Sequence, residues 1–393
     1  MIVLFLTLHE VFKNKIEDKQ IDNNDLEKII ALIEGAEKPV IICGAGIKNS
    51  NSQEEVISLS KSLNIPLVSS AGHGDVIPFD CDLYAGQMGP RGNKLASYLA
   101  NHSDLILAIG TRLGFNSTFY SYDNISKSAK IVQVDIDPIA LGRYFPIELG
   151  INNDAKKFLE NLSSLIIDKK FNHNNSVWVN NFYSEKKKYY KNRDNEADTN
   201  SKIIQPSGLF KELREILPKN SSVTLDAGTL CLQATDQFYF SKPKSLFTPL
   251  DFGLVGFSFA AGLGVKLAQP NTPVFSLMGD GGFGMTVSEL STAVQHKINT
   301  ITIVMNNRSW GAEKAYQRDY YNKRYIGADI SSPPFHELAE LYGAKGYHIT
   351  QLKDVKKAIK DALVCNKPAI VNVEVDPKAL YSFRKDSFKH RAK

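Results

Sequence analysis

The sequence predicts an α/β protein made of two doubly wound domains, each a parallel sheet with helices on both faces. Three observations lead to this prediction. Continuous apolar segments alternate with amphipathic ones along most of the chain, which is typical of strands buried on both faces between helices. The chain has 393 residues, more than one core normally holds. A polar stretch poor in aliphatic residues, 168–204, divides the chain in two.

The first half is expected to form one domain over residues 22–167. Asp and Asn residues precede apolar positions spaced three to four apart, which predicts a capped helix over 22–36. The amphipathic stretch 52–64 predicts a second helix, and a third precedes residue 105. Strands are predicted within 38–47, 65–70, 105–109 and 129–138. Segment 168–204 reads as a linker whose middle could form an exposed helix.

The second half is expected to form another domain over residues 205–377, followed by a basic tail over 378–393. Ser207 can cap its first helix, and a helix of small residues at 254–268 can pack closely against its neighbours. Strands are predicted within 221–229, 273–284, 300–307, 335–349 and 354–377, where the last two follow helices. The two halves share an architecture without a repeated sequence motif.

Composition excludes several classes of function. Lys and Arg number 47 against 42 Asp and Glu, so the net charge of +5 is a weak bias. The basic clusters at 186–188 and 384–393 read as solvated surface rather than nucleic-acid contacts. The four cysteines are scattered without metal spacing, as in reduced cytosolic proteins. The apolar run Met1–Leu8 is too short for a bilayer and lacks signal-peptide flanks. We expect a cytoplasmic protein with no nucleic-acid or membrane partner.

The stretch from Met278 to Asn307 carries the main chemical signal. A predicted strand opens into Gly279–Gly282 just before a helix. Glycines at the carboxyl end of a strand let a ligand approach the backbone, and a helix N-terminus favours phosphate. The carboxylate of Asp280 would repel phosphate unless a divalent cation lay between them. Mg²⁺ commonly bridges protein carboxylates or amides to phosphates, so this turn predicts a Mg²⁺-diphosphate site.

The next predicted strand ends in Asn306-Asn307, whose amide oxygens would reach the same rim if the two strands are neighbours. Each motif alone is an ordinary turn former. Twenty-four residues separate Gly279–Gly281 from the amide pair, and a strand–turn–helix–strand unit with that spacing is much more specific.

This unit resembles the signature of the thiamine-diphosphate enzymes. The resemblance implies Mg²⁺ ligands at Asp280, at Asn307 and at the backbone oxygen of Ser309. It also implies that Val255 lies where an apolar residue bends the cofactor, the alternative being a core valine. The cofactor-binding positions that it implies are Asp226, Gly228, Thr229, Val255, Gly279, Asp280, Gly281, Gly282 and Asn307.

The order of domains resembles the acetolactate-synthase-like branch of these enzymes, and residues 306–327 resemble the sulfoacetaldehyde acetyltransferases. The resemblance implies conversion of sulfoacetaldehyde and phosphate into acetyl phosphate and sulfite. A carboligase or 2-oxo acid decarboxylase is the alternative. Substrate and acceptor are both anions, so Arg308, Lys314 and Arg324 are candidate anion contacts, although each could be a surface charge. Trp310 could pack on cofactor or substrate, or within the core.

The same resemblance implies a further domain ahead of the central one, carrying the glutamate that activates the cofactor. Residues 1–21 are all that precede the central domain here, and we find no matching glutamate, so the catalytic residue stays unassigned. We expect a fragment, one half of a split enzyme or a non-catalytic cofactor-binding relative, within a homo-oligomer or beside a partner chain. The turn Cys43–Ser50 resembles the start of a dinucleotide fingerprint but lacks its third glycine, so we expect no nucleotide there. A nucleotide-binding or NAD-deacylase-like module would need the complete fingerprint.

Overall fold

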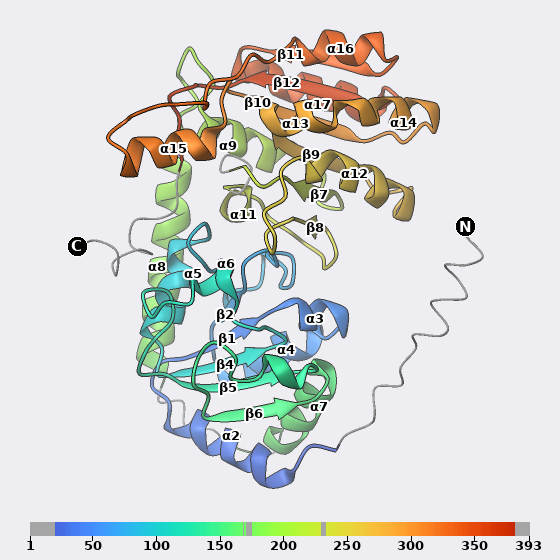
Figure 1. Ribbon diagram of the computed structural model, residues 1–393. Coiled ribbons are helices and arrows are strands. Elements are labelled where there is room, and N and C mark those ends of the chain that lie inside the picture. Colours follow the sequence, from blue (N-terminus) through green and yellow to red (C-terminus); the bar gives the residue numbers. More distant parts are fainter. Residues whose placement is uncertain (1–19, 168, 170–174, 229–232, 382–393) are drawn as a thin grey trace.

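Two six-stranded sheets, all of whose neighbouring strands run parallel, form the framework of the protein (Figure 1). The computed structural model describes residues 20–167, 169, 175–228 and 233–381. Thr229, the apolar run Met1–Leu8 and the basic cluster at 384–393 lie outside the described residues. Helices flank both sheets, so the predicted α/β class with two doubly wound domains is confirmed.

The first sheet has the order β3-β2-β1-β4-β5-β6, the strand order of a dinucleotide-binding fold. Its strands are β1 Pro39–Cys43, β2 Leu67–Ser69, β3 Tyr84–Gln87, β4 Leu105–Ile109, β5 Lys130–Asp135 and β6 Leu149–Asn152. Its helices are α2 Asn23–Gly35, α3 Ala45–Asn49, α4 Gln53–Leu63, α5 Lys94–His102, α6 Phe115–Thr118 and α7 Ala155–Ile166. Ile41 of β1 packs with α2, α4 and α7, whereas Ile42 packs with α5 on the opposite face.

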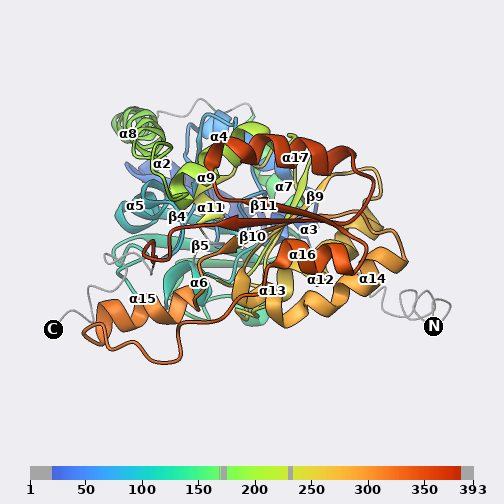
Figure 2. The same ribbon diagram turned by 90° about the horizontal axis from the view of Figure 1, so that it is seen from above.

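The second sheet has the order β11-β12-β10-β9-β7-β8. Its strands are β7 Ser222–Leu225, β8 Leu246–Phe247, β9 Val274–Gly279, β10 Ile301–Asn306, β11 Lys345–Ile349 and β12 Ala369–Glu374. Its helices are α9 Pro206–Ile216, α11 Ala234–Gln237, α12 Phe257–Ala268, α13 Asp280–Thr286, α14 Leu290–Gln295, α15 Gly311–Tyr320, α16 Phe335–Leu341 and α17 Val355–Val364. Short 3₁₀ turns lie at Pro138–Ala140, Val287–Glu289 and Leu352–Asp354. Figure 2 shows α9 and α17 on one face and α12, α13 and α16 on the other.

The stretch expected to be a linker contains a long helix, α8 Ser176–Asn195, that packs against both domains (Figure 1). Trp178 and Phe182 are buried against the first sheet, and the indole N–H of Trp178 donates to the carbonyl oxygen of Pro39 at 3.2 Å. The Tyr189 hydroxyl donates to Asp236 of the second domain at 2.8 Å. Within the predicted basic cluster, Lys186 donates to two backbone carbonyls of the first domain. The helix is therefore docked rather than exposed.

Each sheet has a point where the chain order reverses, and ligands of open parallel sheets bind at the carboxyl side of such points. In the first sheet the reversal lies between β1 and β4, and in the second it lies between β7 and β9. Among the described residues, no helix has both the length and the apolar character needed to cross a membrane.

Candidate functional site

A cavity of about 330 Å³ lies at the reversal point of the second sheet. Asp226 directly follows β7, Asp280 follows β9 and Asn307 follows β10. Because β9 lies between β7 and β10 and all three are parallel, these side chains meet at one rim. The structure brings together most of the residues predicted from sequence: the cavity is lined by Asp226, Gly228, Val255, Gly279, Asp280, Gly281, Gly282, Asn307, Ser309 and Trp310.

The predicted metal ligands Asp280 and Asn307 are buried, and Asp280 presents a carboxylate oxygen with no hydrogen-bond partner. Asp280 is 1% exposed; its Oδ2 accepts from the Ser332 hydroxyl, whereas its Oδ1 is unpartnered. The amide oxygen of Asn307 accepts from the backbone N–H of Ser309 at 3.2 Å, and its Nδ2 is unpartnered. Burial raises the pKa of the Asp280 carboxyl. A cation beside Oδ1 would relieve the cost of burying this carboxylate.

This donor set fits Mg²⁺ better than a transition metal. Within the described ranges, no group of three or more His, Cys, Asp or Glu side chains could hold a metal ion. One carboxylate with amide and backbone oxygens is a hard, incomplete set of ligands. Mg²⁺ normally completes such a set with waters and phosphate oxygens.

Gly281 and Gly282 line the cavity, and we call them the glycine floor. Their neighbours leave no room for a side chain at either position. A Cβ at Gly282 would lie 2.1 Å from Oδ2 of Asp226, and one at Gly281 would lie 2.6 Å from the Trp310 ring. Asp226 accepts from the backbone N–H groups of Gly256 at 3.0 Å and Phe257 at 2.9 Å. It therefore caps α12 while packing against the turn after β9. Burial raises its pKa.

The first amide of the Asn-Asn pair orients the turn that carries the second. Asn306 Nδ2 donates to Oδ1 of Asn372 at 3.2 Å, and Asn372 Nδ2 donates to Glu374 at 3.1 Å. The amide oxygen of Asn306 accepts from the backbone N–H of Arg308 at 3.3 Å. Arg308 has φ of 53°, a left-handed conformation that costs a non-glycine residue free energy. The amides thus hold a strained turn between Asn307 and Ser309.

The three basic residues predicted as anion contacts do not line this cavity. Arg308 is exposed, with its guanidinium 3.8 Å from Glu374. Lys314 pairs with Asp329, and the exposed Arg324 donates to the carbonyl oxygen of Tyr321.

The central domain instead supplies Arg91, Phe115 and Asn116 to the cavity lining, none of which sequence reasoning singled out. The available signal was the Gly89-Pro90-Arg91-Gly92 turn, which follows β3 and therefore lies at the carboxyl rim of the first sheet.

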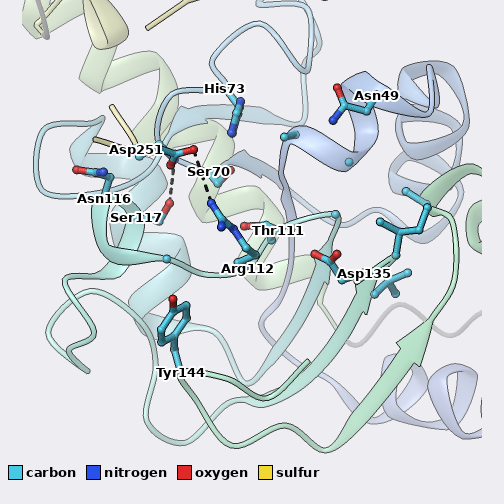
Figure 3. Close-up of a pocket in the computed structure, with 18 of the residues that line it drawn as sticks. Asn49, Ser70, His73, Thr111, Arg112, Asn116, Ser117, Asp135, Tyr144 and Asp251 are labelled. Carbon is cyan, nitrogen blue, oxygen red and sulfur yellow. Dashed lines mark hydrogen bonds and ion pairs between the residues drawn. The ribbon is translucent and has the colours of Figure 1, made fainter. Parts of the chain in front are cut away.

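A second cavity, of about 580 Å³, lies at the reversal point of the first sheet (Figure 3). Gly44 and Gly46, at the start of α3, pack directly on Gly110 after β4: a Cβ at Gly44 would lie 2.2 Å from the Gly110 carbonyl oxygen. The incomplete fingerprint therefore has a packing role, and the absence of a nucleotide stays a prediction. In Figure 3, Arg112 faces Asp251 of the second domain across 3.6 Å. Asn116 and Asp251 line both cavities.

Comparison with known proteins agrees with this geometry. Residues 226–373 match the family model for the C-terminal TPP binding domain of thiamine pyrophosphate enzymes, and residues 26–162 match the model for their central domain. The sulfoacetaldehyde acetyltransferase of Castellaniella defragrans is 32% identical over 357 residues. A probable acetolactate synthase large subunit of Methanocaldococcus jannaschii is 31% identical over 359 residues. These matches cover 86% and 90% of this chain, and the chain spans about 60% of the length of either relative.

Proposed function

Because this chain belongs to the thiamine pyrophosphate enzymes, whose central and C-terminal domains it carries, we propose that it binds thiamine diphosphate (TPP) with Mg²⁺ at the rim of the second sheet. The observation that carries this proposal is the unpartnered, buried Oδ1 of Asp280 beside the glycine floor. Asp280, Asn307 and the backbone oxygen of Ser309 would hold the metal. Gly281 and Gly282 would contact the diphosphate, and Val255 would support the bent cofactor.

Bound TPP supplies a nucleophilic carbon for attack on carbonyl groups, while the protein binds and orients it. We propose that the reaction is acetyl transfer, in which sulfoacetaldehyde loses sulfite and phosphate receives the acetyl group. The support is the resemblance of residues 306–327 and the similarity to a protein named sulfoacetaldehyde acetyltransferase. An acetolactate-synthase-like reaction is the second candidate, because a relative of that name has nearly the same identity to this chain.

Further protein is proposed to complete the site, either a second copy or a partner chain. Two apolar side chains from the loop after β8 support this: Phe252 is 90% exposed and Leu254 is 52% exposed, and Phe252 lines the cavity. Such exposure costs free energy unless another surface covers it.

The cofactor proposal is tested by titrating the purified chain with TPP in the presence and absence of Mg²⁺. We expect Mg²⁺-dependent binding, which Asp280→Asn weakens by at least about 10-fold, since even outer-shell changes at metal sites cost that much. Glu313→Gln is the matched control, because Glu313 lines the same cavity but is exposed. Equal affinity of the Asp280→Asn variant and the wild type would remove the metal assignment.

The reaction is tested on the native protein isolated from its natural source, so that any partner chain is retained. Sulfite release from sulfoacetaldehyde, dependent on phosphate, is the expected result. Acetolactate formation from pyruvate without sulfite release would replace this reaction with the second candidate. TPP binding without either activity would identify the chain as a cofactor-binding relative.

A further inference from the structure

The central domain places a partly buried cation in the wall of the cofactor cavity. Arg91 lies in the turn between β3 and α5, yet it lines the cavity of the second domain, as Trp310 and Tyr316 do. Among the lining residues that the structure describes, it is the only Lys or Arg. The carboxylates of Asp226 and Asp280, in contrast, lie at the rim of the second sheet, across the cavity from the central domain.

Close backbone packing fixes the turn that carries Arg91. Gly89 has φ of 112°, and a Cβ there would lie 2.5 Å from the carbonyl oxygen of Asn116. A Cβ at Gly92 would lie 2.3 Å from the carbonyl oxygen of Gln87. The backbone N–H of Met88 donates to Ser69 of β2 at 2.8 Å. Glycines on both sides of Pro90-Arg91 thus let the turn press against its neighbours and hold the arginine in place.

The guanidinium is oriented by a neutral partner that itself joins the two domains. Arg91 Nη1 donates to Oδ1 of Asn116 at 3.2 Å, and Asn116 Nδ2 donates to the carbonyl oxygen of Leu250. Burial lowers the pKa of Arg91 to about 10, so the group stays charged at neutral pH. The amide of Asn116, which carries no charge of its own, helps to orient the guanidinium.

We propose that Arg91 is a specificity-determining residue that binds the anionic end of the substrate, a sulfonate or a carboxylate. The inference rests on the proposed function, because both candidate reactions use a small anionic carbonyl compound. A guanidinium matches the two oxygens of such a group in a bidentate pair, and burial strengthens that pair. Because Arg91 is the only Lys or Arg in the described lining, we expect the anionic end at Arg91 and the carbonyl toward the cofactor.

The test uses the chain loaded with TPP and Mg²⁺, and two unreactive probes, 2-hydroxyethanesulfonate and lactate. In these probes an alcohol replaces the reactive carbonyl. We expect Arg91→Gln to weaken probe binding by about 10- to 100-fold, the usual effect of losing a hydrogen bond to a charged group. TPP affinity should stay at the wild-type value. The probe affinity of Arg91→Lys should fall between those of the wild type and Arg91→Gln. Arg324 is an exposed cation outside the cavity, so Arg324→Gln should bind the probes as the wild type does.

A second measurement needs no variant. The arginine reagent phenylglyoxal should modify Arg91 more slowly when either probe is present, as read from the peptide that contains it. Preference for the sulfonate supports both proposals, whereas preference for lactate supports Arg91 and favours the acetolactate-synthase-like reaction. Unchanged probe affinity in Arg91→Gln, or a wild type that binds TPP but neither probe, would overturn the role of Arg91. Failure of the wild type to bind TPP at all would instead overturn the proposed function on which the inference rests.

Discussion

At the scale of single residues, two glycines of the rim differ sharply in what surrounds them. A Cβ at Gly282 would lie 2.1 Å from the carboxylate of Asp226, which caps α12. A Cβ at Gly279 would meet no atom within 4 Å, and Gly279 has an ordinary φ of −79°. Identical substitutions at these two positions therefore compare a crowded glycine with an open one.

We predict that Gly282→Ala destabilises the folded chain by about 1–3 kcal/mol, the usual cost of overpacking, because Asp226 must move and α12 loses its cap. Gly279→Ala should leave the melting temperature within about 1 °C of wild type. Differential scanning calorimetry compares the two. A Gly282→Ala variant as stable as Gly279→Ala would show that the cap tolerates displacement.

Single residues also show where sequence reasoning reaches its limit. The meeting of Asp280 and Asn307 at one rim was predictable because each directly follows a strand and the two strands are close together in the sequence. Arg91 and Asn116 were not, because they reach the cavity only through the packing of one domain on the other. The basic residues that follow the motif lie elsewhere: Lys314 is close in sequence to the proposed metal ligands, yet it pairs with Asp329 and does not line the cavity.

At the scale of elements, β10 and β12 are joined by an amide pair near each end. At the carboxyl end the pair is Asn306 with Asn372, 2% and 1% exposed, and at the other end Asn299 donates to Asn366 at the surface. Only the buried pair leads to the strained turn at Arg308. The exposed pair, which lies just before the two strands, therefore serves as a control for the stability that the buried pair contributes.

We predict that Asn372→Ala lowers the free energy of unfolding by about 1–3 kcal/mol, because the amide of Asn306 loses its partner away from water. The same variant should weaken Mg²⁺-dependent TPP binding, since the turn between Asn307 and Ser309 loses its support. Asn299→Ala should change either quantity little, because its amide pair with Asn366 is exposed and Asn299 has no left-handed backbone. Urea denaturation and cofactor titration measure the two effects. Matching losses in both variants would refute a special role for the buried pair.

The strands that sequence reasoning missed share a physical feature. They are β3, β6 and β8, which have two to four residues each and lie at the edges of the sheets. Central strands have continuous apolar sequences because both faces are buried, so they were predictable. An edge strand needs only a few backbone hydrogen bonds. The sequences Tyr84–Gln87 and Leu149–Asn152 contain glycine and polar residues, and no run of apolar residues marks them.

At the scale of the whole molecule, helix α8 and hydrogen bonds between polar groups join the two domains. The 168–204 stretch was predicted as a linker because its average polarity is high, but α8 buries Trp178, Val179 and Phe182 on one side. A few apolar side chains suffice to dock a polar helix, and an average over the stretch hides them. Relative placement of the domains also depends on single groups such as Asp75, for which no sequence pattern exists.

The last prediction concerns that carboxylate. Asp75 of the first domain is fully buried; it pairs with Lys48 at 2.8 Å and accepts from the backbone N–H groups of Ser245 at 3.0 Å and Leu246 at 3.1 Å. It therefore holds β8, the two-residue edge strand of the second sheet, from the other domain. Asp75→Ala would leave Lys48 and two amides without this partner, at a cost of about 3 kcal/mol or more.

Because that loss falls on the contact between the domains, we expect Asp75→Ala to lower the melting temperature and to split the calorimetric transition into two, as the domains unfold less cooperatively. Lys244→Ala is the matched control: Lys244 donates to Asn51 across the same interface at 2.9 Å, but in solvent. Its removal should cost no more than about 0.5 kcal/mol and leave the shape of the transition unchanged. A single, unshifted transition in Asp75→Ala would mean that the apolar contacts and α8 alone couple the domains.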